Sequence, residues 1–238
     1  MKTRAIAIPA LVLLCCAWQA HAHAAQQPSS LSDLPLIEVD PPGAPKGLAI
    51  FYSGDGGWAA LVKSVSAQLA AAGVRVVGLN SLRYFWSPRR EDEATGDLAR
   101  ILRTYLPQEA TPDGVMLIGY SRGADVLPFL VNRLPAELRR RVSSIVLIAP
   151  GHETSFEIHV GDWLSRSASG LPVIPQIERL GVRLLCVYGD EDADAVCPEL
   201  SGDRIASLKI GKGHHLSGAY EEIAKRILAF ADSPQAPQ

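Results

Sequence analysis

The sequence has little sulfur and no apolar run that would make a good membrane span. Only four cysteines and two methionines occur in 238 residues, and two of the cysteines lie near the N-terminus. The uncharged stretch there, residues 5–20, is shorter than the ~20 apolar residues that a spanning helix needs, and histidines soon interrupt it. The formal net charge is −2, so the composition gives no reason to expect a nucleic-acid partner.

The first 24 residues have the organisation of a secretory signal peptide. Lys2 and Arg4 precede the uncharged stretch, and the small residues of "AHAHAA" offer a cleavage site after Ala22 or Ala24. Leucine and cysteine, rather than small residues, precede the two N-terminal cysteines, so we expect no lipid anchor. The sequence therefore predicts export of the mature protein into an oxidising compartment.

Export removes Cys15 and Cys16 with the signal peptide and leaves Cys186 and Cys197. Two such cysteines in an oxidising compartment are predicted to form a disulfide. The alternative is a buried thiol at Cys186, on a predicted strand, and an unrelated thiol at Cys197.

The mature chain alternates short apolar runs with longer amphipathic stretches. The runs are apolar at nearly every position, which is typical of strands buried on both faces of a parallel sheet. They cover residues 47–52, 74–79, 115–119, 144–149, 183–188 and 205–210. Helices are predicted over 58–72, 92–105, 122–133, 174–180 and 218–231. This order predicts an α/β fold, with a doubly wound, mostly parallel sheet and helices on both faces.

One domain is expected, because the sequence contains no internal repeat and no second set of elements. It is predicted to cover residues 46–231, after the signal peptide at 1–24. The segments 25–45 and 232–238 are rich in Pro, Ser and Gln, and we expect both to be flexible ends.

A serine between two glycines lies where the third predicted strand becomes a helix. The pentapeptide "GYSRG", residues 119–123, has the G-x-S-x-G pattern of a nucleophile elbow, a tight turn that exposes a serine hydroxyl at a helix N-terminus. Glycines on both flanks relieve the crowding of such a turn. The pattern in this context predicts Ser121 as a catalytic nucleophile.

A serine nucleophile needs a base to take its proton and an acid to orient that base. In this kind of fold they follow the serine in the order Asp or Glu, then His. The turn "GDEDADAVCP" offers Asp192 and Asp194, and the turn "GKGHHLSG" offers His214 and His215. Spacing from the preceding glycine favours His214, and the D-x-x-x-P ending slightly favours Asp194, but all four stay candidates.

The developing oxyanion of an acyl-transfer reaction also needs preorganised donors. One candidate is the backbone N–H of Arg122, the residue after the serine. The other is the N–H of Gly54 or Asp55, in the loop "SGDGGW" that follows the first main strand. A glycine-rich loop can instead hold phosphate, but this one matches neither of the usual phosphate-binding patterns.

Four aromatic residues near predicted strand ends are candidates for substrate binding. They are Trp58, Tyr84, Phe85 and Trp86, which would receive an acyl chain, lie on a membrane surface, or only cover an edge of the core. Asp125, with Asp55 and the acidic run 190–194, would form a negative mouth that attracts an ammonium group, or else pack locally. The irregular segment 151–173 is a candidate lid.

No metal ion and no cofactor are expected. A calcium loop that starts at Asp190 would need glycine and glutamate where the sequence has Ala195 and Ser201. His152 and Glu153 lack a second histidine at metal-ligand spacing.

Five motifs taken together resemble one protein family. "FYSGDGGW", "RYFW", "GYSRGADVLPF", "YGDEDADAVCP" and "GHHLSGAY", within about residues 46–230, resemble the VirJ family of bacterial virulence proteins, which includes the related domain of AcvB. The resemblance implies a periplasmic serine hydrolase with an α/β-hydrolase fold, lysyl- or alanyl-phosphatidylglycerol as substrate, and a link to type IV secretion. By position it marks Ser121, Asp194 and the pair His214 and His215.

The sequence therefore predicts a periplasmic serine hydrolase that cleaves a carboxylic ester, and the resemblance points to a phospholipid headgroup and peripheral contact with a membrane. One alternative is a catalytically idle module of the same fold that docks on an envelope secretion complex. Another is an acyltransferase that uses the same serine.

Overall fold

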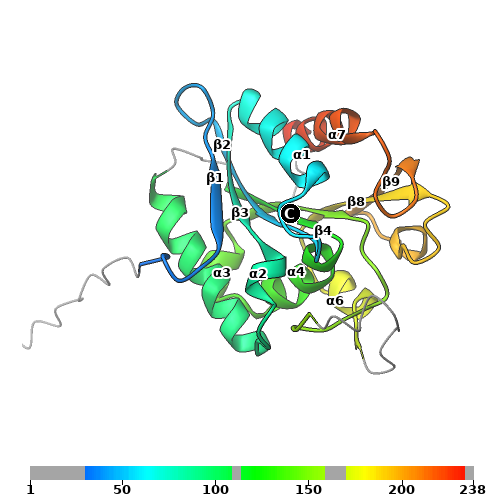
Figure 1. Cartoon of the computed structure of the whole chain (residues 1–238), viewed down its shortest axis with the longest axis horizontal. Coiled ribbons are helices and arrows are strands. Elements are labelled where there is room, and N and C mark those ends of the chain that lie inside the picture. The colour runs from blue at the N-terminus through cyan, green and yellow to red at the C-terminus, as the bar shows by residue number, and fades with distance from the viewer. Residues whose placement is uncertain (1–29, 109–113, 159–169, 234–238) are drawn as a thin grey trace, which may run out of the picture.

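The computed structural model describes residues 30–108, 114–158 and 170–233, so the predicted signal peptide lies outside it. A seven-stranded sheet forms the centre of the described structure, in the order β1-β3-β2-β4-β5-β8-β9 (Figure 1). Its strands are β1 (Leu36–Val39), β2 (Gly47–Tyr52), β3 (Val74–Leu79), β4 (Val115–Tyr120), β5 (Val142–Ile148), β8 (Arg183–Asp190) and β9 (Ile205–Lys212).

Neighbouring strands run parallel, except that β1 pairs with β3 in the antiparallel direction. From β2 the chain moves outward to β3 and then crosses back to β4, β5, β8 and β9 on the other side. The sheet is therefore doubly wound, and its strand order reverses between β2 and β4, where ligands bind in such sheets. The predicted α/β class is confirmed.

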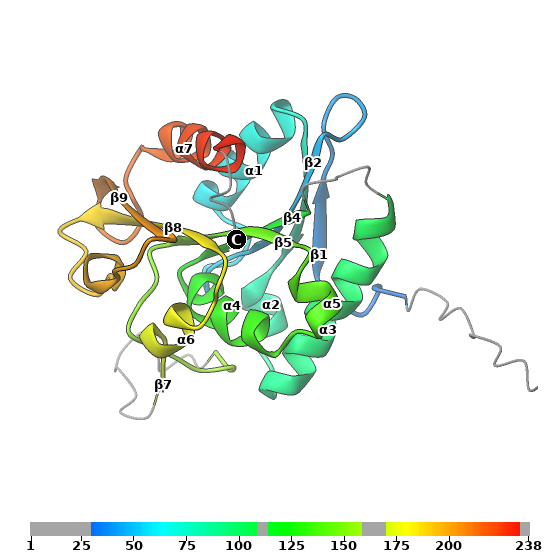
Figure 2. The same cartoon turned by 180° about the vertical axis from the view of Figure 1, so that it is seen from behind.

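Helices cover both faces of the sheet (Figures 1 and 2). The helices α1 (Ala60–Ala71) and α7 (Tyr220–Asp232) lie side by side on one face. On the other face lie α2 (Ser81–Tyr84), α3 (Glu91–Tyr105), α4 (Arg122–Arg133), α5 (Ala136–Arg139) and α6 (Ile174–Glu178). Each face buries its own hydrophobic cluster, so the sheet separates two cores. Within the residues described, no helix has the length and apolarity needed to cross a bilayer.

The predicted strands are all observed. The strands β2, β3, β4, β5 and β8 are largely buried, as continuous apolar runs indicate, whereas the edge strand β9 has no buried residue. In β4, for example, all six residues are buried, and this strand leads directly into the G-x-S-x-G turn. The predicted long helices are also observed, and α4 has the predicted bounds, 122–133.

The prediction of a flexible segment at 25–45 was wrong for its second half. Leu36–Val39 form β1, an edge strand whose mixed polar and apolar residues do not give the continuous apolar pattern of a central strand. Side chains also fasten this segment to α3: Nη2 of Arg100 lies 2.6 Å from Oδ1 of Asp33, and the Tyr105 hydroxyl donates to Oε1 of Glu38 at 2.6 Å.

The first residues of the segment predicted as a lid, 151–158, include side chains that are part of the core. The short strands β6 (Glu153–Thr154) and β7 (Leu171–Pro172) pair in the antiparallel direction. Phe156 is buried with its ring centroid 6.0 Å from that of Phe85 and 5.8 Å from that of Phe129. The middle of the predicted lid, 159–169, lies outside the described residues.

Candidate active site

Ser121 occupies a sharp turn between β4 and α4. Its backbone has φ 51° and ψ −123°, in the left-handed region that non-glycine residues rarely adopt. The flanking glycines are required by close packing: a Cβ on Gly119 would lie 2.5 Å from the Gly123 carbonyl oxygen, and one on Gly123 would lie 2.2 Å from that of Tyr52. The turn therefore has the geometry of a nucleophile elbow.

A chain of two hydrogen bonds joins Ser121 to a buried carboxylate. The Ser121 hydroxyl lies 2.8 Å from Nε2 of His214, and Nδ1 of His214 lies 3.2 Å from Oδ2 of Asp192. The Asp192 side chain is 5% exposed, whereas that of His214 is 38% exposed. A base between a partly accessible serine and a buried acid has the arrangement needed to take up the serine proton.

The second histidine has a different partner. Nδ1 of His215 lies 2.9 Å from the Tyr120 hydroxyl. Burial raises the pKa of Tyr120 to about 12, so this hydroxyl stays protonated at neutral pH, and the tautomer of His215 sets which of the two groups donates. Of the two candidates, the structure thus brings His214 to Ser121 and places His215 at the Tyr120 hydroxyl.

The acid also differs from the sequence preference, which slightly favoured Asp194. The carboxylate at His214 is that of Asp192, while Oδ1 of Asp194 lies 3.8 Å from Nδ1 of His152. His152 also binds Glu199, with 2.6 Å between Nε2 and Oε1, and this bond raises the pKa of His152. Asp194 is therefore next to a second histidine, which the D-x-x-x-P pattern does not reveal.

The backbone of the acid turn explains why Asp192 is the residue that reaches His214. Asp190 is still in β8, where its carbonyl oxygen accepts the N–H of Gly213 at 2.7 Å. Glu191 has φ 65°, which turns the chain back directly after the strand end. Gly189 is so close to the histidine turn that a Cβ would lie 2.1 Å from the Gly213 carbonyl oxygen. The acid turn and the histidine turn are thus in direct backbone contact.

The predicted oxyanion loop lies against the nucleophile. A Cβ on Gly54 would be 3.2 Å from the Ser121 Cβ, so only glycine lets this backbone approach without crowding the serine. Ser53, which the sequence analysis did not single out, anchors the loop: its buried hydroxyl accepts the N–H of Ser81 at 2.9 Å. Asp55 follows Gly54 directly and is partly exposed.

The other predicted donor is at the start of α4. Arg122 is the first residue of this helix, and the first N–H groups of a helix have no acceptor within it. Its side chain points elsewhere: Nη1 donates to the carbonyl oxygen of Ser155 at 2.9 Å. The N–H of Arg122 and the N–H groups of Gly54 and Asp55 thus come from two segments that meet at Ser121.

Three of the four aromatic candidates are part of the core instead. Tyr84 and Phe85 are 2% and 0% exposed, and the Tyr84 hydroxyl donates to Oδ2 of Asp97 at 2.6 Å. Trp58 covers β3: its ring occupies the space where a Cβ of Gly78 would be, at 2.1 Å. Only Trp86, 60% exposed, is free to meet a ligand or a surface. Of the three adjacent aromatics, Tyr84 and Phe85 lie inside and Trp86 lies outside, which the "RYFW" motif alone does not reveal.

Asp125 lies one helical turn after Ser121. Its Oδ1 accepts the N–H of Gly151 at 2.7 Å, which agrees with the local packing role considered for it. Burial raises the pKa of Asp125 to about 7, with smaller contributions from the charges of Asp194 and Asp55. This carboxyl group therefore titrates near neutral pH.

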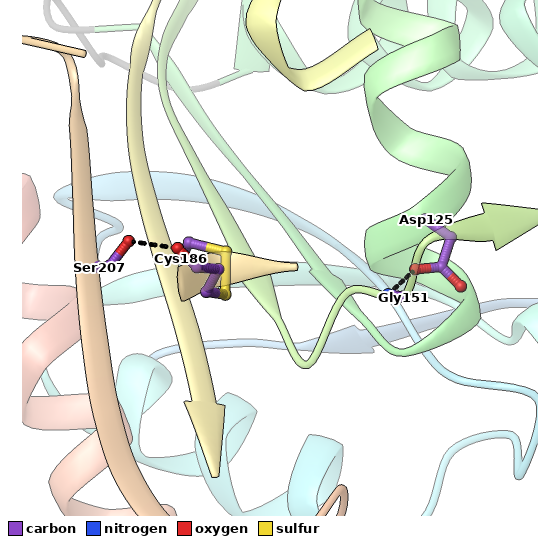
Figure 3. Close-up of a disulfide and its surroundings, with 5 residues drawn as sticks. Asp125, Gly151, Cys186 and Ser207 are labelled. Atoms are coloured by element: carbon purple, nitrogen blue, oxygen red, sulfur yellow. Dashed lines mark hydrogen bonds between the residues drawn. A yellow bond between two sulfur atoms is a disulfide. The ribbon is translucent and has the colours of Figure 1, made fainter. Parts of the chain in front are cut away.

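The predicted disulfide is confirmed. Cys186 on β8 and Cys197, which begins a short 3₁₀ helix (Cys197–Glu199), are bonded with 5.5 Å between their Cα atoms (Figure 3). Both are fully buried, and the carbonyl oxygen of Cys197 accepts the hydroxyl of Ser207 on β9 at 3.0 Å. The bond closes the acid turn that carries Asp192. In the part of the chain that the structure describes, no cluster of His, Cys, Asp and Glu could hold a metal ion.

Several solved structures are similar in fold to this chain. The chain is similar to Est1E from Butyrivibrio proteoclasticus, at 13% identity over 82% of this chain and 91% of that chain, with a TM-score of 0.61. It is also similar to the esterase domain of a Rhodothermus marinus protein (17% identity, 82% and 90% covered, TM-score 0.56). A third is a monoacylglycerol lipase from Paleococcus ferrophilus (14% identity, 83% and 98% covered, TM-score 0.54). The chain therefore has the α/β-hydrolase fold.

The particular family follows from the sequence. The family model for the bacterial virulence protein VirJ matches residues 46–234, and the chain belongs to this family. No curated protein matches the chain.

Proposed function

We propose that this protein is a serine hydrolase that cleaves carboxylic esters. The observation that carries the proposal is the hydrogen-bonded chain from Ser121 through His214 to Asp192, next to the glycine backbone of Gly54. Similarity to the esterases and the lipase described above supports it as an analogy of fold.

The reaction follows from this geometry. Nε2 of His214 takes the proton of the Ser121 hydroxyl as Oγ attacks the ester carbonyl carbon, and Asp192 stabilises the imidazolium that forms. The N–H groups of Arg122 and of Gly54 or Asp55 stabilise the oxyanion. His214 then protonates the departing alcohol, which leaves an acyl group on Ser121. Water, deprotonated by His214, attacks this acyl-enzyme, releases the carboxylic acid and restores the serine.

We further propose an ester with a cationic acyl group, namely an aminoacyl ester such as lysyl- or alanyl-phosphatidylglycerol. Burial is the main cause of the raised pKa of Asp125, and the negative charges of Asp194 and Asp55 are close enough to raise it further. Two carboxylates therefore lie near the helical turn that follows Ser121. A negative site attracts the ammonium group of an aminoacyl ester. Exposed Trp86 is suited to peripheral contact with a membrane, the source of such a lipid.

The place of action in this proposal is the periplasm. Residues 1–24 are predicted to direct export, and a buried disulfide between Cys186 and Cys197 fits an oxidising compartment. Both the membrane and an envelope secretion complex are accessible to a protein in that location.

The test combines labelling with turnover. The mature protein is treated with a fluorophosphonate probe and assayed on aminoacyl-phosphatidylglycerol in vesicles, beside Ser121→Ala and the control Ser64→Ala on α1. We expect the wild type and the control to be labelled and to release the amino acid, and Ser121→Ala to do neither. No labelling of a folded wild type would instead favour the idle docking module.

Substrate class is tested separately. Amino-acid esters with a free α-amine are compared with the same esters N-acetylated, using wild type, Asp55→Asn and Asp194→Asn. We expect kcat/KM to favour the free amine in the wild type, and the preference to shrink in both variants. Equal rates on both esters would retain the hydrolase and exclude recognition of the ammonium group.

A further inference from the structure

A second set of hydrogen bonds, separate from those of His214, links Ser121 to the acid turn. A loop of three residues, 149–151, follows β5 and lies between α4 and the acid turn 190–197. Asp125 on α4 points at this loop, and the Cys186–Cys197 bond lies on its other side (Figure 3). The loop therefore contacts the nucleophile helix α4 on one side and the acid turn on the other.

The first contact starts at the nucleophile helix. Oδ1 of Asp125 accepts the N–H of Gly151 at 2.7 Å, a short bond with an acidic acceptor. The N–H of Asp125 in turn donates to the carbonyl oxygen of Ser121 at 3.0 Å. Asp125 thus binds the nucleophile elbow through its backbone N–H and the loop 149–151 through its side chain.

The second contact leads to the acid. The carbonyl oxygen of Pro150 accepts the N–H of Val196 at 3.1 Å, and the N–H of Ala195 donates to the carbonyl oxygen of Asp192 at 3.3 Å. The disulfide at Cys197 fixes the far end of the same turn. An unbroken series of bonds therefore runs from Ser121 through Asp125 and the loop to Asp192.

The loop also has a strained conformation that needs such support. Ala149 has φ 50°, in the left-handed region, and its N–H donates to the carbonyl oxygen of Val187 at 2.7 Å. A non-glycine residue in that region is strained and persists only when its surroundings hold it there. The bond from the Gly151 N–H to Asp125 is one of the contacts that hold this loop in place.

We propose that Asp125 is a positioning residue, which sets the distance between Asp192 and His214 by holding the loop 149–151 against the acid turn. The proposal rests on the proposed hydrolase function. It does not require a charged Asp125, because the carbonyl oxygen of a neutral carboxyl group accepts an N–H as well. Arg122 favours the charged form, whereas burial and the charges of Asp194 and Asp55 oppose it.

The variants separate the bond from the charge. Asp125→Asn keeps an acceptor oxygen, whereas Asp125→Ala removes it, and Asp125→Leu removes it while filling the space. Asn132→Ala is the matched control on the same helix: Nδ2 of Asn132 donates to the carbonyl oxygen of Gln176 in α6 at 2.9 Å. Circular dichroism verifies that each variant is folded.

Two readouts are used, one of which needs no turnover. In ¹H NMR we expect the low-field signal of the His214 Nδ1 proton, which the bond to Asp192 produces, to move upfield or disappear in Asp125→Ala and Asp125→Leu. In ester assays kcat should fall by about 10- to 100-fold with KM changed less than about twofold. Asn132→Ala should match the wild type in both readouts, and Asp125→Asn, which keeps the acceptor oxygen, should lie nearer to the wild type than to Asp125→Leu.

An Asp125→Leu protein with the wild-type His214 proton signal and the wild-type kcat would overturn the proposal. So would an Asp125→Asn protein as impaired as Asp125→Leu, because the charge of Asp125, and not its bond to Gly151, would then matter. In the Asp192→Asn background, Asp125→Leu should change kcat less than about twofold, since its effect passes through Asp192. Absence of ester turnover in the wild type would defeat only the proposed function, and the His214 proton signal would still decide the role of Asp125.

Discussion

Oδ2 of Asp192 lies 3.2 Å from Nδ1 of His214, across 22 positions of the sequence and between two turns at the ends of neighbouring parallel strands. The same histidine places Nε2 2.8 Å from the Ser121 hydroxyl. The relationship is made by backbone contact of the two turns, through the bond between the Gly213 N–H and the Asp190 carbonyl oxygen. Each prediction below tests one part of this arrangement.

The two candidate acids are expected to differ. Asp192→Asn removes the charge that orients and stabilises His214, and loss of that group from a serine triad costs about 10³- to 10⁴-fold in kcat. Asp194→Asn leaves the carboxylate at His214 in place and should lower kcat by less than about tenfold. The measurement is ester turnover of both variants at pH 8. A larger loss in Asp194→Asn would mean that the turn rearranges when substrate binds.

The two histidines are also expected to differ. His214→Ala removes the group next to the Ser121 hydroxyl and should lower kcat by on the order of 10³-fold or more. His215→Ala removes a bond to the Tyr120 hydroxyl and should reduce kcat by less than about tenfold, with a loss of stability of about 1 kcal/mol. Steady-state kinetics and urea unfolding measure both. Similar, mild losses in the two variants would contradict the assignment of the base.

Stability should depend on pH through Asp125. In the folded protein its carboxyl group keeps a proton up to about pH 7, compared with 3.8 for an ordinary aspartate. The folded state thus binds this proton more tightly, and its contribution to stability is lost as pH rises from about 4 to 7. Asp125→Asn lacks that loss, so its Tm relative to wild type should increase across this range. Thermal unfolding at several pH values provides the comparison, and parallel curves would contradict it.

The disulfide should support activity as well as stability. Both cysteines are buried and separated by 11 positions, and a bond that closes so short a loop stabilises by about 2–3 kcal/mol. The oxidised protein should contain no titratable thiol among Cys186 and Cys197 after denaturation. Reduction should lower kcat before the domain unfolds, because the bond holds the acid turn. A dithiothreitol series followed by turnover and circular dichroism measures this, with Ser64→Ala, a substitution away from the turn, as a control.

Unchanged activity after the disulfide is shown to be broken would contradict this role of the bond. It would leave the contact between Pro150 and Val196, and that between Asp190 and Gly213, as the supports of the acid turn.

Much of the fold was determined by the sequence alone. Strands buried on both faces must be apolar at almost every position, so β2, β3, β4, β5 and β8 are visible as runs. The elbow was visible for a similar reason, since only glycine fits at 119 and 123, where a Cβ would meet backbone oxygens. The disulfide could be predicted from the signal-peptide pattern and from the two cysteines that lie outside it.

Only the tertiary structure chose between neighbours. Asp192 and Asp194, His214 and His215, or Phe85 and Trp86 are of the same chemical type, and spacing to a motif does not tell which side of a turn each faces. For the acid and the base, two backbone features determine which side chain reaches the site. One is the positive φ of Glu191, and the other is the close contact of Gly189 with Gly213, which brings together turns far apart in the sequence. The edge strand β1 escaped prediction because it has only four residues, one of them a glutamate and none of them buried, so it makes no continuous apolar run.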